Sequence, residues 1–585
     1  MSTVDKDRKR VTRRDFMKRV AAIGGTAGLA AASSGTALFM PEKVQAKTGV
    51  PAKWDYEADV VVVGYGGAGV SAAIAAKDAG ASVLVLEKDS LPRGGNTGCS
   101  SGSSTIPEPL KDAATFLKMQ SWGTVTDDEV CTGTAQAFLE LEGWLRKLGC
   151  PLNILTTASA SAGSVPASLL RGGVVSPAFS MLGGNKRRNL TFRKPDGTSG
   201  RGKDLFGFLH GAAAAKGIRL MLATPGKELV QYPETKEIWG VKATAGGKDI
   251  YVRAAKGVVL ATGGFENNPE MTVNYLPGSK SNFVTAIGCP YNTGDGINMA
   301  SRVGAKLWHM NCGEIYIMAC KPASEQFGNA VTTIATSTDL CIWVNRYGKR
   351  FLNERKSWGH TKRNLAIDDF KYEIPPTDEE DYADYPNIPF FWIFDSALMK
   401  AGRLGYPAYD EPGYVYNGGW LAAHMLNRWS VDNQAELDKG WFVRGDTIEE
   451  LGKKLVARDF FGRVVGMDAA GLVETVNKYN QYCAAGKDPD FGRNPKTLIP
   501  LNNPPFYGME LCAAMLNTNG GPVHNQYAQT LDVDGKPIPR LYTPGELGSI
   551  YGFLYQGGGN IPEALSMGRV AGEHAATLSP WKPRA

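Results

Sequence analysis

A glycine-rich turn and a later glutamate are the first residues whose types and spacing point to chemistry. Residues 59–69 (DVVVVGYGGAG) combine a buried-strand pattern with a G-x-G-x-x-G turn, and Glu87 ends a second apolar run, VLVLE. In such a turn Gly64 permits the tight bend, Gly66 lets the backbone approach a pyrophosphate, and Gly69 lets the next helix pack on the strand. Glu87 stands where an acid accepts a hydrogen bond from a ribose hydroxyl. A glycine turn can follow any strand, but here the strand, helix, second strand and acid all stand at the expected offsets, which predicts a dinucleotide site.

The elements around the turn have to hold these residues in place. The pattern predicts a helix over residues 70–79 whose N-terminus is directed at the phosphates. Residues 94–102 (GGNTGCSSG) follow, and their small side chains suit either a flexible linker or a loop lying against a flat cofactor ring. Their place soon after Glu87 favours the cofactor loop. Residues 256–265 (KGVVLATGGF) predict another buried strand ending in a glycine turn, and residues 292–297 (NTGDGI) open a helix.

Further patterns outline the domain organisation. Apolar periodicity predicts two more helices and three strands, at residues 127–148 and 205–216 and at residues 219–222, 228–231 and 238–244. From about residue 306 to residue 506 Trp, Tyr and Phe become frequent and no nucleotide signature occurs, which predicts an inserted domain. A strand closing on a glycine-acid turn at residues 538–546 and a helix at residues 562–576 return to the nucleotide-domain pattern.

The N-terminal residues differ from the rest of the chain of 585 residues. Thr12-Arg13-Arg14-Asp15-Phe16 precedes a mildly apolar run, and a small-residue cleavage site ends at Ala46. This resembles a twin-arginine export signal. The alternative is a membrane anchor, but the run is rich in Gly, Ala, Ser and Thr and too weakly apolar for a comfortable span. We expect export through the twin-arginine (Tat) translocase to the periplasm or the outer face of the cytoplasmic membrane.

Charge and cysteine usage exclude several classes of function. Residues 1–46 hold nine of the 64 Lys and Arg and four of the 58 Asp and Glu, so the remainder carries a net charge of +1. This near-neutral balance argues against a nucleic acid or an anionic membrane as partner. The nine cysteines form no CxxC pair or haem-attachment motif, and the six histidines show no short metal-ligand spacing. We therefore expect no metal site, and most cysteines to be buried as small hydrophobic residues.

Four motifs in a fixed order resemble one flavoprotein family. They are GYGGAG with Glu87, GGNTG, ATGGF with NTGDG, and TPGE with GGGN before the final helix. The family includes fumarate reductases, succinate dehydrogenase flavoprotein subunits, urocanate reductases and 3-ketosteroid Δ1-dehydrogenases. The resemblance implies an α/β fold, with a Rossmann-like FAD-binding domain and an inserted α+β capping domain. The predicted domains are the signal at 1–46, FAD-binding parts at 53–305 and 507–585, and the capping and substrate domain at 306–506.

The resemblance also implies which residues contact FAD. GGNTG contains no histidine of the kind to which the succinate dehydrogenase subunits attach flavin, so non-covalent binding is expected. The expected contacts are Gly64, Gly66, Gly69, Glu87, Lys88, Gly95, Asn96, Thr97, Gly263, Asp295, Glu546, Asn560 and Ile561. The helix after GGGN would direct its positive dipole end at the flavin edge where negative charge collects on reduction, although every helix carries this dipole.

Departures from the fumarate reductase pattern point away from a dicarboxylate. The positions where those enzymes carry cationic or proton-relaying residues hold other side chains here, namely Tyr316, Ile334, Ser337, Trp358, Leu516 and Gln556. Each lost charge-assisted hydrogen bond is worth about 1.5–3 kcal/mol. Fumarate is therefore a poor candidate, and an aromatic, largely apolar pocket for a bulky neutral substrate is expected.

The segment Tyr555-Gln-Gly-Gly-Gly559 resembles the YxGxG stretch of the 3-ketosteroid Δ1-dehydrogenases. That resemblance implies that the Tyr555 hydroxyl and the Gly559 amide hold a substrate ketone, which would stabilise charge developing on its oxygen. The alternative for Tyr555 is a ring packed at the domain seam. The second catalytic tyrosine of the steroid enzymes falls on Trp358, which cannot exchange a proton.

A replacement proton donor should therefore lie nearby. Tyr316, His360 and Arg363 are the candidates, while His360 could equally fill the domain interface.

These observations predict an exported FAD-dependent oxidoreductase acting on CH-CH bonds. We expect reduction of a carbonyl-activated C=C bond, with electrons from a separate haem-protein or quinone-linked partner. A 3-ketosteroid Δ1-dehydrogenase and a non-catalytic flavin electron carrier are the alternatives.

Overall fold

The structure is a computed structural model that describes ten stretches of the chain. All the elements below belong to one compact unit, Gly49–Ala585. The described residues are 50–100, 102–121, 126–158, 186–276, 284–327, 339–354, 386–405, 429–459, 462–552 and 558–581.

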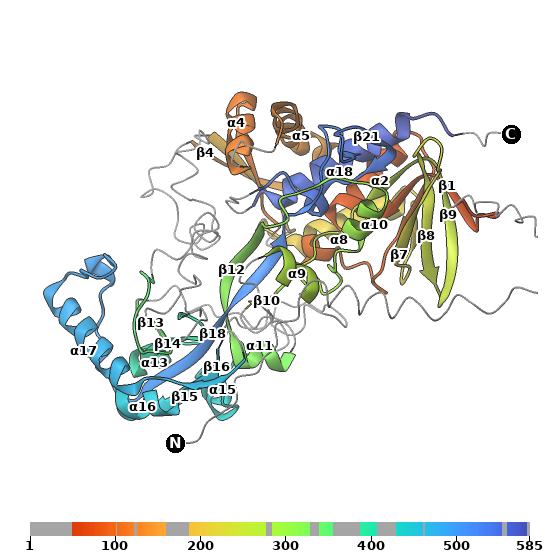
Figure 1. Cartoon of the computed structure of the whole chain (residues 1–585). Helices are drawn as coiled ribbons and strands as arrows, with labels where there is room; N and C mark the ends of the chain where they lie inside the picture. Colours follow the sequence, from red (N-terminus) through yellow and green to blue (C-terminus); the bar gives the residue numbers. More distant parts are fainter. Residues whose placement is uncertain are drawn as a thin grey trace, which may run out of the picture. The chain divides into compact units, whose positions relative to one another are not determined.

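The larger sheet is built on β1 (Tyr56–Val63), which pairs in parallel with a strand on each side (Figure 1). Residues 60–63 of β1 are buried on both faces of the sheet, as the uninterrupted valine run predicts for a parallel strand covered by helices. The sheet runs in the order β20-β21-β9-β1-β2-β6, and β8 and β7 extend it from β9. The other strands are β2 (Val83–Leu86), β6 (Arg219–Met221), β7 (Gly226–Gln231), β8 (Ile238–Ala245), β9 (Lys248–Leu260), β20 (Gln529–Leu531) and β21 (Pro537–Tyr542).

Two helices that are far apart in the sequence pack against each other beside this sheet. They are α2 (Gly67–Asp78) and the closing helix α18 (Asn560–Thr577), side by side in Figure 1. A Cβ atom built on Gly568 would lie 2.3 Å from the Ala68 carbonyl oxygen, and one on Gly572 would lie 2.2 Å from that of Ala72. The contact is therefore so close that only glycine fits at both positions. The contact fixes the position of the start of α18 relative to the glycine turn before α2.

Other helices and a small sheet complete this part of the unit. The sheet has three antiparallel strands in the order β3-β5-β4, at Ser104–Glu108, Lys186–Phe192 and Leu152–Ala158. The helices are α3 (Gly95–Cys99), α4 (Leu110–Gln120), α5 (Asp128–Lys147), α8 (Gly202–Ala215), α9 (Pro269–Tyr275) and α10 (Asp295–Arg302). The predicted helices and strands in this region all form, with ends that differ by a few residues.

A second sheet is organised around the long strand β18 (Phe506–Thr518). On one side of β18 the sheet continues through β14 to β13, and on the other side β10 pairs with β18. Strands β12 and β15 also pair with β18. The remaining strands are β10 (Val284–Ala286), β12 (Gly313–Cys320), β13 (Cys341–Asn345), β14 (Phe390–Asp395) and β15 (Val443–Gly445). β10 and most of β18 lie outside residues 306–506, so the sheet extends beyond the predicted domain boundaries, which stay a prediction.

Aromatic side chains fill the core beside the second sheet, which explains the change of composition after residue 306. Trp343, Trp392, Phe390 and Trp429 are each at most 1% exposed. Helix α17 (Ala469–Ala485) contributes to a separate apolar cluster with residues of β13 and β14.

The shorter elements of this region are two hairpin strands, four small helices and a 3-10 turn. They are β16 (Val456–Arg458), β17 (Val464–Gly466), α11 (Lys321–Phe327), α13 (Ser396–Lys400), α15 (Gln434–Asp438), α16 (Ile448–Lys454) and Pro495–Thr497. Two further strands, β11 (Leu307–Trp308) and β19 (Gly521–Pro522), pair with each other.

Four buried charges interlock near the end of β13. Arg350 bonds Glu354 at 2.8 Å and Asp488 at 3.0 Å, and Arg493 bonds Glu354 at 3.3 Å. The ion pairs of Arg350 therefore belong to the interior of the fold. Because each charge has an opposite partner, the group can be buried without leaving an unpaired ion.

The expectation for the cysteines can be compared with the structure, whereas the predicted export signal at residues 1–46 lies outside the described residues. None of the nine cysteines, all of which lie in described residues, forms a disulfide, and all but Cys99 and Cys483 are buried. No described helix combines the length and the apolarity needed to cross a membrane.

Candidate functional site

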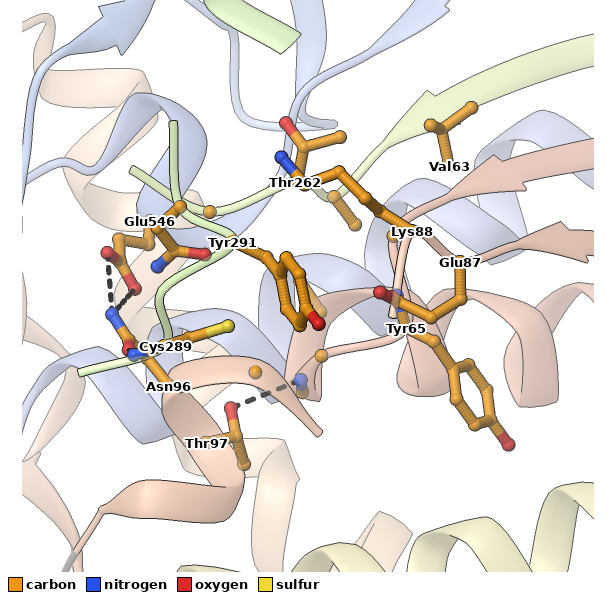
Figure 2. Close-up of a pocket in the computed structure, with 18 of the residues that line it drawn as sticks. Val63, Tyr65, Glu87, Lys88, Asn96, Thr97, Thr262, Cys289, Tyr291 and Glu546 are labelled. Carbon is orange, nitrogen blue, oxygen red and sulfur yellow. Dashed lines mark hydrogen bonds between the residues drawn. The ribbon is translucent and has the colours of Figure 1, made fainter. Parts of the chain in front are cut away.

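A pocket of about 780 Å³, open to solvent, lies where the strands of the parallel sheet end. Its wall comes from segments spread between Val63 and Ala564. In Figure 2, Asn96 and Glu546 lie at one end of the view and Glu87 and Lys88 at the other. Ligands of open parallel sheets bind at the carboxyl ends of the strands, where neighbouring connections diverge.

The glycines after β1 play two different roles. Gly64 has φ +97°, and a Cβ there would lie 2.3 Å from the Ala261 carbonyl oxygen, so the fold itself requires glycine. A Cβ on Gly69 would lie 2.0 Å from the Gly64 carbonyl oxygen, which makes Gly69 a packing residue. At Gly66 the nearest protein atom would be the Gly94 carbonyl oxygen at 3.5 Å, an ordinary contact. The protein itself does not require glycine at Gly66, which lines the pocket and leaves room there for a ligand.

The start of helix α2 offers backbone N–H groups to an anion. Its N-cap is Gly66, which has no side chain, and no acidic residue stands in its first turn. The Gly67 amide donates to Thr97 Oγ1 at 3.1 Å, which joins the two glycine loops. The positive end of a helix with no carboxylate beside it suits a phosphate.

Glu87 lies at the end of β2, with its carboxylate against the glycine turn. One oxygen accepts from the Tyr65 amide and the other from the Asp89 amide, each at 2.6 Å. Burial raises the pKa of Glu87, and these two N–H bonds oppose the rise. The bonds hold the carboxylate at the pocket wall, where a ribose hydroxyl could reach it.

Lys88 is the neighbouring cation, and it pairs with a residue from the motif before α10. Its Nζ lies 2.7 Å from Asp295 Oδ2 and donates to Thr293 Oγ1, also at 2.7 Å. Both Lys88 and Asp295 line the pocket. The pair thus links the second strand of the sheet to the NTGDG turn.

Asn96 connects the far wall of the pocket. Its Nδ2 lies 3.0 Å from Glu546 Oε1 and 2.8 Å from Glu266 Oε1, and its Oδ1 accepts from the Cys289 amide at 2.8 Å. Glu546 stands in the 3-10 turn Gly545–Gly548. The GGNTG motif therefore brings together residues that are hundreds of positions apart.

Strand β18 also reaches this wall. The Leu516 carbonyl oxygen lies 3.4 Å from Asn96 Nδ2, and Thr518 Oγ1 accepts from the Phe265 amide at 2.8 Å. The strand that organises the second sheet therefore ends against the residues that line the pocket.

The predicted FAD contacts are residues that line the pocket, the packing residue Gly69, and the first two residues of α18. All except Gly69, Asn560 and Ile561 line the pocket. Asn560 and Ile561 are the first residues of α18, at the helix end that was predicted to face the flavin. The assignment of individual contacts to FAD stays a prediction.

The predicted catalytic residues are less fully described. Tyr555, Trp358, His360 and Arg363 lie outside the described residues, and of Tyr316 only the backbone, in β12, is described. Gly559 is the N-cap of α18.

Sequence reasoning missed several residues of the site. Cys289, Tyr291 and Asn292 line the pocket, and they stand in or just before the NTGDG motif, which could have indicated them. Glu266 directly follows ATGGF. Tyr551 carried no signal at all, yet a Cβ on Gly559 would lie 2.2 Å from its hydroxyl oxygen.

Comparison with known proteins identifies the family. Residues 59–561 match the family described as FAD binding domain. The chain belongs to this family. Its cofactor is FAD, as predicted, and the protein is an FAD-dependent oxidoreductase.

A relative and two solved structures show how far the likeness extends. A digoxin reductase of Eggerthella lenta is 27% identical, with 97% of this chain and 98% of that protein covered. The open conformation of a flavocytochrome c3 fumarate reductase is 26% identical, with a TM-score of 0.63 over 90% of this chain and 79% of that one. A 3-ketosteroid Δ1-dehydrogenase of Sterolibacterium denitrificans is 22% identical, with a TM-score of 0.65 over 89% of this chain and 99% of that one. The predicted α/β flavoprotein fold is confirmed.

The residues of the pocket fit FAD. The uncapped start of α2 suits the pyrophosphate, Glu87 suits a ribose hydroxyl, and Gly66 leaves space that no protein atom fills. Asn96 and Glu546 add polar atoms to the same pocket wall.

Proposed function

We propose that this protein is an exported FAD-dependent reductase that adds two hydrogens across a carbonyl-activated C=C bond of a bulky, largely apolar substrate. The observation that carries the proposal is the replacement of the anion-binding side chains of the fumarate enzymes. Tyr316, Trp358, Leu516 and Gln556 stand at those positions. A dicarboxylate would have to leave water without charged partners, which is unfavourable.

FAD, once bound and reduced by two electrons from the partner, would supply a hydride to the carbon remote from the carbonyl. The chain then has to stabilise the negative charge that develops on the carbonyl oxygen, and to deliver a proton to the neighbouring carbon. Tyr555 and the Gly559 amide are the proposed donors to that oxygen. Gly559 is the N-cap of α18, and the positive end of that helix dipole would add to the stabilisation. Tyr316, His360 and Arg363 are the proposed proton donors.

The relative named digoxin reductase supports the choice of substrate class. It matches over nearly the full length of both chains, and its name denotes reduction of digoxin rather than of a small diacid. A 3-ketosteroid Δ1-dehydrogenase is the second candidate, favoured by the YxGxG-like segment ending at Gly559. The likeness to the solved steroid enzyme supports the fold alone.

Anaerobic flavin spectroscopy tests the proposal against its alternatives. The dithionite-reduced holoenzyme is mixed with enones, aryl acrylates, steroids and fumarate, and the return of oxidised flavin absorption is followed. We expect fast reoxidation by one unsaturated carbonyl class and none by fumarate. Bleaching of oxidised flavin by a saturated 3-ketosteroid would support the dehydrogenase, and no response to any compound would support an electron carrier.

A matched variant tests the proposed donor. Tyr555→Phe keeps the ring but loses the hydroxyl, and we expect reoxidation about 10²-fold slower or more, the usual effect of removing one such donor. Unchanged rates in Tyr555→Phe would contradict the assigned role.

Export and electron supply belong to the same proposal. We propose Tat-dependent export, with electrons from a haem-protein or quinone-linked partner. Replacing Arg13 and Arg14 by lysine should retain the protein in the cytoplasm, as checked by cell fractionation. Unchanged export of that variant would contradict the assignment.

A further inference from the structure

Two acidic side chains converge in the wall of the FAD pocket. Glu266 follows the glycine turn after β9 and is 6% exposed, while Glu546 lines the pocket itself. Both accept from the same nitrogen, Asn96 Nδ2, which lies 2.8 Å from Glu266 Oε1 and 3.0 and 3.1 Å from the two oxygens of Glu546. A single amide therefore holds both carboxyl groups.

One oxygen of each carboxyl group faces the same small space beside Gly264. A Cβ built on Gly264 would lie 2.7 Å from Glu266 Oε2 and 2.9 Å from Glu546 Oε1. Glu266 Oε2 is buried and forms no hydrogen bond of ordinary geometry in the described structure. Two largely buried carboxyl groups this close cannot both become charged at moderate cost, so the pair holds a proton up to a higher pH than an isolated carboxyl group does.

The groups around the pair do not offset its charge. Glu563, on α18, adds a third carboxyl group whose charge raises the pKa of Glu546. The Cys99 thiol interacts electrostatically with both carboxyl groups of the pair, and the Cys289 thiol interacts with Glu266. The favourable neighbours are neutral donors, namely Asn96, Asn292 and the backbone amides of Gly264, Glu266 and Thr518. Among the described residues, neither Lys nor Arg is one of the strongest influences on either carboxyl.

The titration of the pair follows from this environment. Burial raises the pKa of Glu266 to about 7, against the opposing hydrogen bond from Asn96. Burial and the charge of Glu266 raise the pKa of Glu546 well above its usual value. The pair thus changes charge near neutral pH.

We propose that Glu266 and Glu546 share one proton and that binding of FAD is linked to retention of this proton. FAD brings a doubly negative pyrophosphate into a pocket that already holds acidic groups, and it displaces water from the wall that Glu546 lines. Both effects favour the protonated pair. The retained proton also gives the wall an O–H donor for the hydroxyl-bearing chain of the cofactor. The inference rests on the FAD pocket and is independent of the substrate.

The sign of the pH dependence is fixed by this linkage. The bound form holds the proton more tightly, so the pKa of the pair is higher with FAD than without it. Affinity for FAD is therefore fully present at pH values below about 7 and falls as the pH rises above it. Release of one proton changes the dissociation constant by at most about tenfold for each pH unit.

Release of FAD from the full-length holoenzyme measures this effect. The fluorescence of freed FAD gives the dissociation constant after dilution at a series of values between about pH 6 and pH 9, with circular dichroism as a check on folding. We expect the wild-type constant to rise by up to about tenfold per pH unit above about pH 7, and the constant of Glu266→Gln to be nearly independent of pH. Glu546→Gln removes the same shared proton and serves if Glu266→Gln does not fold.

Glu563→Gln is the matched control. Burial raises the pKa of Glu563 to about 7 as well, but its carboxylate accepts from the Ser549 hydroxyl and the Ile550 amide and does not line the pocket. This variant should keep a dissociation constant that rises with pH, with the rise starting at somewhat lower pH because the charge of Glu563 raises the pKa of Glu546. A wild-type constant that does not change with pH, a Glu266→Gln profile as steep as wild type, or loss of the profile in Glu563→Gln would each overturn the proposal.

Discussion

At the scale of single residues, the glycine motif separates into positions that serve the fold and one that serves the ligand. Gly64 and Gly69 face backbone oxygens, whereas Gly66 has room for a methyl group within the protein. The motif predicted a separate role for each of the three glycines, but not the atoms that Gly64 and Gly66 face, because Ala261 and Gly94 come close to them only in the folded chain.

Exchanging Gly66 for alanine should separate cofactor binding from folding. Gly66 has φ −81° and ψ −166°, which alanine adopts without strain. We expect Gly66→Ala to melt like wild type as apoprotein and to bind FAD at least about tenfold more weakly, a loss of about 1.4 kcal/mol. Thermal unfolding and FAD titration measure the two effects.

Gly64→Ala is the contrasting variant. An alanine at position 64 would have to keep a left-handed backbone conformation, and its Cβ would clash with the Ala261 carbonyl oxygen. We expect the apoprotein to lose roughly 1–3 kcal/mol of stability. Equal effects of the two substitutions on stability would contradict the separation of roles.

Residues that stand in local motifs could be predicted from the sequence, whereas contacts between distant segments could not. Glu87 and Asn96 stand in motifs, so their place in the site was predictable. The meeting of Asn96 with Glu266 was not, because it depends on how two loops 170 residues apart come together.

At the scale of elements, the contact between α2 and α18 sets the geometry of the cofactor site. The final helix was predictable from its periodicity, and its range was close to that observed. Its partner was not predictable, since both helices carry small residues on several faces. Gly568 and Gly572 reveal the contact only once the carbonyl oxygens of Ala68 and Ala72 are seen beside them.

An alanine at Gly572 should disturb this contact. The new Cβ would lie 2.2 Å from the Ala72 carbonyl oxygen, so the helices must move apart. We expect Gly572→Ala to lower the free energy of unfolding by about 1–3 kcal/mol, as measured by denaturant titration.

Gly211, in α8, supplies the matched control. It is an exposed helical glycine, and a Cβ there would meet nothing within 4 Å. Gly211→Ala should be neutral or should stabilise the protein by roughly 0.5–1 kcal/mol. A loss of stability as large as that of Gly572→Ala would show that helix packing is not the cause.

At the scale of the whole molecule, the cofactor pocket joins segments from Val63 to Ala564. FAD bound there contacts parts of the chain that are separated by most of its length. The α/β class and the order of the motifs were predictable because each motif is local. The pairing of β10 with β18 was not, because neither strand carries a mark of its partner.

Removal of FAD should therefore destabilise the protein as a whole. Free FAD at about 100 times its dissociation constant adds about 2.7 kcal/mol to the free energy of unfolding. We expect a lower melting temperature for the apoprotein than for the reconstituted protein by calorimetry, and a smaller effect of FMN, which lacks the adenosine part. An unchanged melting temperature on adding FAD would contradict the assignment of the pocket.

The path of β18 has a consequence for how the protein can be studied. One end of this strand pairs with β14 beside the tryptophan-rich core, and the other end bonds Asn96 and the backbone of Phe265 at the cofactor wall. A stiff strand transmits a tilt at one end as a displacement at the other. A shift of β18 at its β14 end would therefore be expected to move groups of the cofactor wall, and the visible spectrum of the bound flavin is a measurement that can detect this.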